Sequence, residues 1–127
     1  QQRSSAASDV YKRQGYLFET NDKKILFSGD TAVSENLKKY GKNLDILVHE
    51  VFSSETFENK TKEWQIYHKA HHTSSIDLGK IANELKPNKL VLSHILFWGA
   101  SSESLLSDIS QNFNGTSIIA EDLLVID

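Results

Sequence analysis

Apolar and polar positions alternate along most of the chain in short runs that predict strands and helices in turn. Two apolar runs, residues 16–19 and 25–28, flank the polar segment 20–24, which has the length of a hairpin turn. The more continuous apolar runs at residues 45–48 and 89–93 are typical of buried strands. The pattern therefore predicts an antiparallel pair followed by two inner strands.

Helices are predicted in the segments between and after these strands. Ser34 is placed to cap a short helix that ends at Gly41. Ser74 with Asp77 forms a capping-box-like start to a helix that Pro87 stops. Two more helices are expected at about residues 61–70 and 102–113, and two final strands at residues 117–120 and 123–126.

Strands that alternate with helices after an opening hairpin indicate an α/β fold with a mixed sheet. The near-continuous apolar character of residues 46–48 and 90–92 indicates strands that are covered on both faces. The predicted helices suffice to cover one face of this sheet. We therefore expect the layer that covers the other face to come from outside this sequence.

The first fourteen residues lack the hydrophobic period of the rest of the chain. They contain no apolar core of about 7–15 residues, so they do not form a signal peptide. The chain also contains no methionine. We expect residues 1–14 to be a disordered arm or a foreign tail, and the domain to span residues 15–127.

The composition is that of one ordinary domain, with 127 residues. Fourteen basic residues against 17 acidic ones give a net charge of −3, which disfavours a globally basic nucleic-acid binder. No apolar run approaches the roughly 18 residues of a membrane span, so we expect no membrane partner. The sequence does not define the localisation, and the cytoplasm is the default expectation. The absence of cysteine leaves histidine and carboxylate side chains as the metal ligands to consider.

Chemistry-bearing side chains follow three of the predicted strands. Asp30 follows the second strand, the pair His49 and Glu50 ends the third, and His94 ends the fourth. Ligands of α/β proteins bind at the carboxyl ends of strands, so these side chains are candidates for one common site. Three further histidines precede the Ser74 cap: His68, His71 and His72.

Each of these residues also has a purely structural interpretation. Asp30 in its Gly-Asp-Thr turn can cap the next helix, and His94 can be a solvent-facing strand end. His68, His71 and His72 can complement the dipole of a helix at its C-terminus. The alternative function is therefore a non-catalytic α/β binding or interaction domain. The joint occurrence of these residues at corresponding strand ends favours a catalytic site, because independent structural roles do not predict it.

Four motifs in order resemble the C-terminal half of a metallo-β-lactamase-fold hydrolase, of the ribonuclease Z-like or arylsulfatase-like branch. They are FSGDT at residues 27–31, DILVHE at 45–50, HTSSIDLGKIA at 72–82 and KLVLSH at 89–94, with EDLLVID at the end. The resemblance covers about residues 15–127 and implies half of an αββα sandwich. It also implies a hydrolase with two divalent metal ions, for which zinc is expected.

The resemblance assigns a role to one residue in each motif. Asp30 matches the carboxylate that bridges the metals, and His94 matches the last metal-ligating histidine. His72 matches the histidine that donates a proton to the leaving group, and Glu50 is similar to the acidic residue that supports this site. His68 and His71 are expected to be supporting or surface groups.

The sequence departs from the family in one respect. The family's first motif, H-x-H-x-D-H, and a further ligating histidine do not occur in these 127 residues. Zinc needs four ligands including water, so we expect this fragment to bind catalytic metal weakly and to be inactive alone. Its partner would then be the missing N-terminal half of its own domain, with a homodimer left open.

The substrate is not defined by these motifs, because the shared site activates water and the surrounding loops choose the substrate. A small-molecule ester and an RNA are both candidates. A nuclease is expected to carry a basic exosite or arm, and Lys60, Lys62 and Lys69 are too few to make one.

Overall fold

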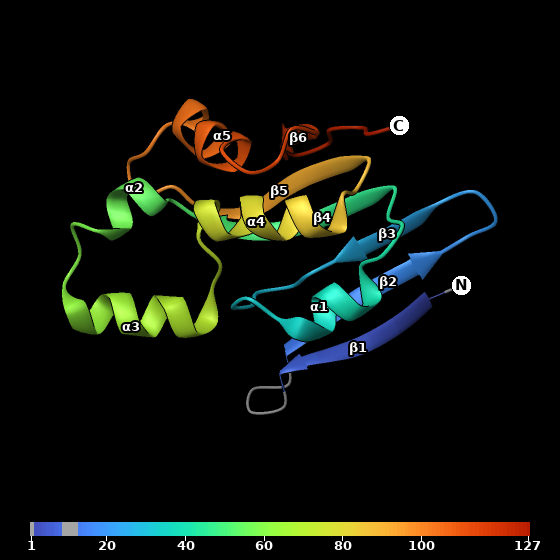
Figure 1. Cartoon of the computed structure of the whole chain (residues 1–127), viewed down its shortest axis with the longest axis horizontal. Coiled ribbons are helices and arrows are strands. Elements are labelled where there is room, and N and C mark those ends of the chain that lie inside the picture. Colours follow the sequence, from blue (N-terminus) through green and yellow to red (C-terminus); the bar gives the residue numbers. More distant parts are fainter. Residues whose placement is uncertain (1, 9–12) are drawn as a thin grey trace.

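The computed structural model describes the backbone of residues 2–8 and 13–127 and the side chains from Gly15 onward. Over these residues, six strands form one sheet in the order of the sequence, β1-β2-β3-β4-β5-β6 (Figure 1). β1 pairs with β2, and β2 with β3, in antiparallel fashion, and the remaining neighbours are parallel. The predicted mixed sheet with an opening hairpin is thus confirmed. The strands are β1 (Gln2–Ser8), β2 (Arg13–Glu19), β3 (Lys24–Phe27), β4 (Ile46–Phe52), β5 (Lys89–Leu96) and β6 (Thr116–Ile119).

The helices begin at hydroxyl side chains that accept backbone N–H groups. Thr61, Ser74 and Ser101 each accept the N–H of the residue three positions on, which satisfies a donor that the helix leaves unpaired. Ser34 is an N-cap by position, although its side chain makes no capping hydrogen bond. The helices are α1 (Glu35–Tyr40), α2 (Ser54–Phe57), α3 (Lys62–His71), α4 (Ser75–Leu85) and α5 (Ser102–Ser110).

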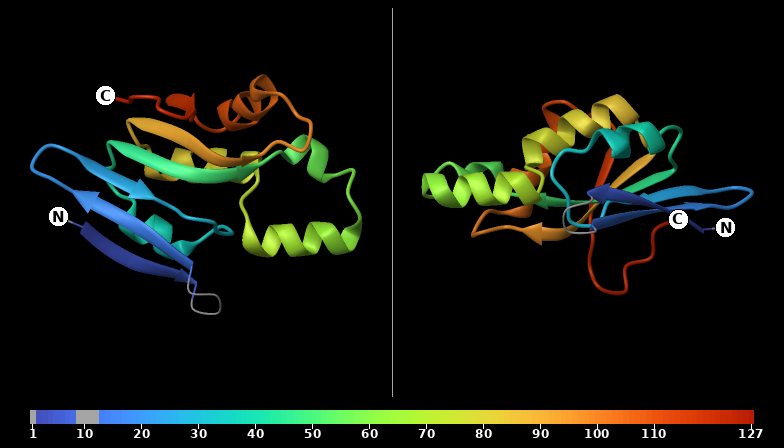
Figure 2. Two further views of the ribbon diagram at one scale, coloured as in Figure 1. Left: turned by 180° about the vertical axis from the view of Figure 1, so that it is seen from behind. Right: turned by 90° about the horizontal axis from the view of Figure 1, so that it is seen from below.

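One face of the sheet carries the core. Leu26, Leu47 and Leu90 are register neighbours on β3, β4 and β5, and each is at most 1% exposed. They belong to one cluster with Leu78 of α4 and Ile109 of α5. Figure 2 shows α1 and α4 on this side of the sheet. The chain therefore supplies one complete helical layer.

The opposite face is apolar as well, and part of it is open to solvent. Tyr16, Phe27 and Val48 are register neighbours across β2, β3 and β4, so their side chains share a face. Phe27 is 40% exposed, and its ring meets Phe18 edge to face at 5.6 Å. We call these four residues the open sheet face. Its exposure agrees with the expectation that this chain covers only one side of its sheet.

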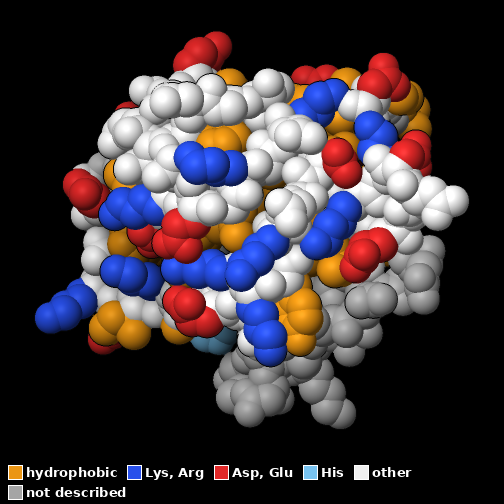
Figure 3. All heavy atoms as spheres, turned by 45° about the vertical axis from the view of Figure 1, so that its right-hand side comes forward, with side chains coloured by type: hydrophobic (Ala, Val, Ile, Leu, Met, Phe, Trp, Pro, Cys, Tyr) orange, Lys and Arg blue, Asp and Glu red, His pale blue; other side chains and the backbone are white. Residues whose placement is uncertain are grey.

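The rest of the surface shown in Figure 3 mixes charges of both signs around smaller apolar areas. Lys38, for example, lies 3.4 Å from carboxylate oxygens of both Glu35 and Glu84. No helix among the described residues has the length and apolarity to cross a bilayer.

Two terminal segments differ from the prediction. Residues 123–126 do not form a strand, because the chain turns at Glu121–Leu124 and leaves Leu123 99% exposed with φ +64°. Residues 2–8, expected to be without structure, form the edge strand β1. Strand pairing uses backbone groups, so a polar sequence can add to a sheet edge. Residues 1 and 9–12 lie outside the described part, and a foreign origin for residues 1–14 stays a prediction.

The open sheet face makes Phe27 and its neighbour Leu26 a matched pair for mutation. Phe27→Ser is expected to lower the binding of a hydrophobic fluorescent dye and to change the free energy of unfolding by only about 1 kcal/mol, since Phe27 packs on one side only. Leu26→Ala opens a cavity in the core and is expected to cost about 2–5 kcal/mol. Dye fluorescence and urea unfolding measure both. Equal costs for the two variants would contradict the assignment of the faces.

Candidate active site

A β-bulge at the end of the sheet positions His94. Glu50 of β4 pairs with Ser93, and Val51 pairs with Ile95, so His94 is an extra residue in β5. Its φ of +43° lies in the left-handed region, which costs energy for any residue with a side chain. The bulge turns the imidazole out of the ladder, and the side chain is 53% exposed. The sequence pattern placed His94 after the strand, whereas the structure has it within β5.

Asp30 lies opposite this bulge. It follows β3 after Gly29, which adopts a φ of +64° that glycine takes at no steric cost. The Nδ1 atom of His94 lies 3.1 Å from Oδ1 of Asp30. Asp30 and His94 therefore meet as predicted, although 64 positions separate them in the sequence.

Glu50 is the buried centre of the site. Its side chain is 1% exposed, and its Oε1 accepts hydrogen bonds from the backbone N–H of Thr31 and from Nδ1 of His72, each at 3.0 Å. Its own backbone N–H donates to Oγ of Ser28 at 3.2 Å. The hydroxyl of Thr73 donates to the carbonyl of Thr31 at 2.6 Å. One carboxylate thus ties together the segment after β3, the strand β4 and the link between α3 and α4.

His72 is held by this carboxylate from the C-cap position of α3. Its Nδ1–H donates to Glu50, so the tautomer of the neutral ring is fixed and Nε2 is the atom that can exchange a proton with a substrate. The ring centres of His72 and His94 are 6.0 Å apart. The two pairs, Glu50–His72 and Asp30–His94, therefore lie side by side at the carboxyl ends of β3, β4 and β5.

His49 does not belong to this site, although it is the neighbour of Glu50 in the sequence. Successive side chains of a strand point to opposite faces, and His49 points into the helical layer, where it is 0% exposed. Its Nδ1–H donates to the carbonyl of Glu50 at 2.7 Å, and Nε2 has no hydrogen-bond partner among the described residues. Burial lowers the pKa of His49 to about 4 against a smaller opposing effect of that hydrogen bond. His49 is a neutral core residue.

His68 and His71 lie on α3 and face aromatic rings. His68 stacks on Trp64 with ring centres 3.7 Å apart, and His71 stacks on Tyr67 at 4.5 Å. The ring of His68 is also 5.9 Å from that of His72. This placement supports the interpretation of both as supporting or surface groups, whose roles stay predictions.

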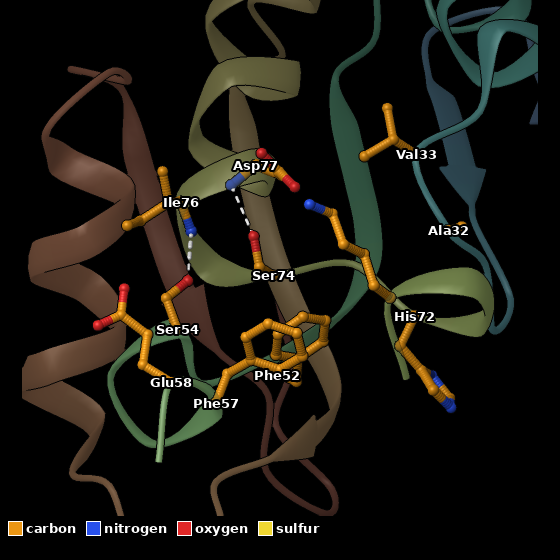
Figure 4. A pocket seen from close by; sticks show the side chains of 11 residues that line it. Ala32, Val33, Phe52, Ser54, Phe57, Glu58, His72, Ser74, Ile76 and Asp77 are labelled. Atoms are coloured by element: carbon orange, nitrogen blue, oxygen red, sulfur yellow. Dashed lines mark hydrogen bonds between the residues drawn. The ribbon is translucent and has the colours of Figure 1, made fainter. Parts of the chain in front are cut away.

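Two hollows flank the cluster. One has a volume of about 400 Å³ and lies between the end of β4, α2, the end of α3 and the first turn of α4 (Figure 4). In that view the rings of Phe52 and Phe57 lie between Glu58 and His72, and the His72 ring points away from Ser74 and Asp77. The other hollow, about 340 Å³, is lined by His94, Phe97 and Glu121 among others. Each histidine of the cluster therefore borders open space.

The four side chains do not make a complete metal site. Across residues 15–127, whose side chains are described, no group of three or more His, Asp or Glu side chains is arranged to hold a metal ion. The two ligand types that are present, a carboxylate and an imidazole, suit zinc. Asp30 and His94 thus fit as part of a ligand set that further residues would have to complete.

The sequence pattern identified all four residues of the cluster and missed the groups that position them. Ser28, Thr31 and Thr73 hold the loops to Glu50 through the hydrogen bonds given above. Each belongs to a recognised motif, FSGDT or HTS, so the motif letters themselves could have pointed to them. The bulge at His94 has no such signature.

Comparisons with known proteins give both sequence relatives and structural neighbours. No family model matches the chain. The chain is 33% identical over 106 residues to ribonuclease Z of Leuconostoc mesenteroides, a match that covers 81% of this chain and 31% of the relative. It is 27% identical over 106 residues to ribonuclease Z of Archaeoglobus fulgidus, a match that covers 83% of this chain and 32% of the relative. The chain therefore spans about a third of the length of these relatives. The resemblance to ribonuclease Z in sequence is confirmed.

Solved structures agree on the fold. The metallo-β-lactamase-fold protein YhfI from Bacillus subtilis aligns with a TM-score of 0.74 and 20% identity over 90% of this chain and 44% of YhfI. The short form of human tRNase Z aligns with a TM-score of 0.61 and 20% identity over 90% of this chain and 38% of that protein. Zn²⁺-bound PqqB from Methylobacterium extorquens aligns with a TM-score of 0.62 and 15% identity over 91% of this chain and 43% of PqqB. The chain thus has the fold of part of a metallo-β-lactamase-fold protein.

The buried His49 predicts a loss of stability in mild acid. The unfolded chain binds a proton at His49 near pH 6.5, whereas the folded chain does so only near pH 4. Above pH 6.5 the buried His49 therefore does not lower the free energy of unfolding. As the pH drops from 6.5 to 4, this group lowers the free energy of unfolding by about 3 kcal/mol. Urea unfolding of the wild type and of His49→Leu at both pH values measures this share. The same pH dependence in both proteins would contradict it.

Proposed function

We propose that this chain is the C-terminal part of a metal-dependent hydrolase that cleaves a phosphodiester bond in RNA. The observation that carries the proposal is the buried Glu50 carboxylate that holds Nδ1 of His72, with Asp30 and His94 directly beside this pair. The relatives named ribonuclease Z favour RNA over a small ester as the substrate. A small-molecule ester remains the second candidate for the same chemistry.

His72 is proposed as the general acid. When the ring is protonated, Nδ1–H stays on the Glu50 carboxylate and the proton on Nε2 can pass to the departing oxygen as its bond to phosphorus breaks. Water supplies the oxygen that forms the new bond to phosphorus. Glu50 is proposed as the positioning residue, since its negative charge and fixed Oε1 keep the ring oriented through this step.

Asp30 and His94 are proposed as metal ligands. Asp30 would contribute a carboxylate oxygen and His94 a ring nitrogen. Divalent metal, proposed as two zinc ions, would supply Lewis acidity and a water of lowered pKa. Because the described residues offer only part of a ligand set, we expect the 127-residue chain alone to retain zinc poorly and to be inactive.

A non-catalytic binding or interaction domain is the competing function. It would treat Asp30, His72 and His94 as independent turn and strand-end residues. The 3.1 Å contact between Asp30 and His94, and the bulge that creates it, favour the hydrolase because a strand end needs neither.

The full-length protein allows a direct test with variants of this site. His72→Ala is expected to lower kcat for cleavage of a precursor tRNA by about 10²–10⁴-fold with little effect on substrate binding, because a general acid acts in the transition state. Asp30→Ala is expected to lose both metal and activity. Asp22→Ala is the control, since Asp22 is an exposed aspartate in the turn between β2 and β3.

The same assay separates the candidate functions. Cleavage of precursor tRNA would support the nuclease, and cleavage of aryl esters without RNA cleavage would move the proposal to the second candidate. No hydrolysis of either substrate by the zinc-loaded full-length protein, or full activity of His72→Ala, would overturn the assignment.

A further inference from the structure

Helix α3 presents aromatic side chains that do not serve the core. None of its residues is buried, whereas α4 buries six and α5 buries two. Tyr67 is 58% exposed, and its neighbour Ile66 is 63% exposed. Figures 1 and 2 show α3 beyond the end of the sheet, connected to the rest through its two ends. Packing among the described residues therefore leaves most of Tyr67 exposed.

The rings of α3 form two rows at the helical spacing of four residues. The inner row, Trp64 and His68, continues to His72, and the outer row consists of Tyr67 and His71. Tyr67 and His71 have ring planes only 29° apart at 4.5 Å. Nδ1 of His71 also donates to the carbonyl of Tyr67 at 2.7 Å, which fixes the imidazole against the helix. The outer row is therefore an ordered pair of nearly parallel rings.

The inner row anchors the helix, while Tyr67 of the outer row stays 58% exposed. Trp98, from the loop after β5, meets Trp64 edge to face at 4.3 Å and His68 at 5.2 Å. Trp98 in turn lies 5.4 Å from Phe52 at the end of β4. Among the described residues, these ring contacts hold α3 through its inner row.

The charge around these rings is positive in a chain that is negative overall. Between residues 60 and 72 there are three lysines, Lys60, Lys62 and Lys69, against one glutamate, whereas the whole chain carries −3. Lys60 also lies over the Trp64 ring, with its ammonium 5.3 Å from the ring centre. These three lysines are too few for a basic exosite, so the exposed ring carries the recognition and the cations assist it. Proteins bind single-stranded nucleic acid with flat exposed rings and nearby cations.

We propose that the Tyr67–His71 row is a stacking subsite for a base of single-stranded RNA, next to the reacting phosphate. The inference rests on the proposed function for the identity of the polymer. Tyr67 is linked to His72 through His68, with ring centres 5.1 Å and 5.9 Å apart along that path. A strand whose base lies on the outer row would bring a neighbouring phosphate toward His72. The subsite selects for an unpaired segment, because a base inside a duplex offers no free face.

The test measures binding without cleavage. A fluorescein-labelled 12-nucleotide oligoadenylate and an abasic strand of the same length are titrated with the 127-residue chain in EDTA, and anisotropy is followed. Tyr67→Ala is expected to weaken binding of the oligoadenylate about tenfold and to leave the abasic strand unchanged, since only bases stack. Tyr67→Phe should retain the wild-type affinity. Ile66→Ala is the matched control, with an exposed apolar side chain on the same helix.

Three results would overturn the subsite: no binding of the oligoadenylate by the wild type, equal affinities of the wild type and Tyr67→Ala, or equal losses in Tyr67→Ala and Ile66→Ala. The last result would indicate a general apolar surface of the kind that docks a protein. The outcome is separable from the proposed function. Tyr67-dependent binding in a full-length protein that never cleaves RNA would remove the nuclease and keep the subsite. RNA cleavage by a full-length protein whose oligoadenylate affinity is the same in the wild type and Tyr67→Ala would remove the subsite and keep the nuclease.

Discussion

The buried carboxylate of Glu50 is the interaction on which the site depends. A carboxylate that is 1% exposed must be compensated, and here the compensation comes from Thr31 N–H and His72 Nδ1–H, which belong to two segments with no secondary-structure pairing to each other. Removal of either donor would leave charge buried without that partner, which is among the most costly changes in a protein. The same two hydrogen bonds therefore stabilise the fold and orient the candidate acid.

The sheet places two chemically different pairs at one edge. Parallel pairing of β3, β4 and β5 aligns their carboxyl ends, and the bulge in β5 turns His94 toward Asp30. In the proposed function, a chain that spans about a third of the length of its relatives accounts for both the open sheet face and the partial ligand set. A second layer would cover Phe27, and further ligands would complete the metal site.

Hydrophobic periodicity predicted most of the fold, because the strands and helices of the core bury one regular face each. It failed at the margins: residues 123–126 form an apolar run like that of a strand but pair with no strand among the described residues, and residues 2–8 pair through backbone groups that leave no pattern. Asp30, Glu50, His72 and His94 were found through motifs. The bulge, the inward direction of His49 and the rings of α3 depend on three-dimensional packing, which periodicity does not encode.

The central claim is that Glu50 fixes the tautomer of His72 and leaves Nε2 to act on a substrate. Nitrogen-15 NMR of the imidazole groups at a pH where His72 is neutral tests it directly, since the two ring nitrogens have distinct shifts when one carries the proton. The account predicts a proton on Nδ1 and a bare Nε2 for His72. A proton on Nε2, or a signal averaged between the two tautomers, would contradict it.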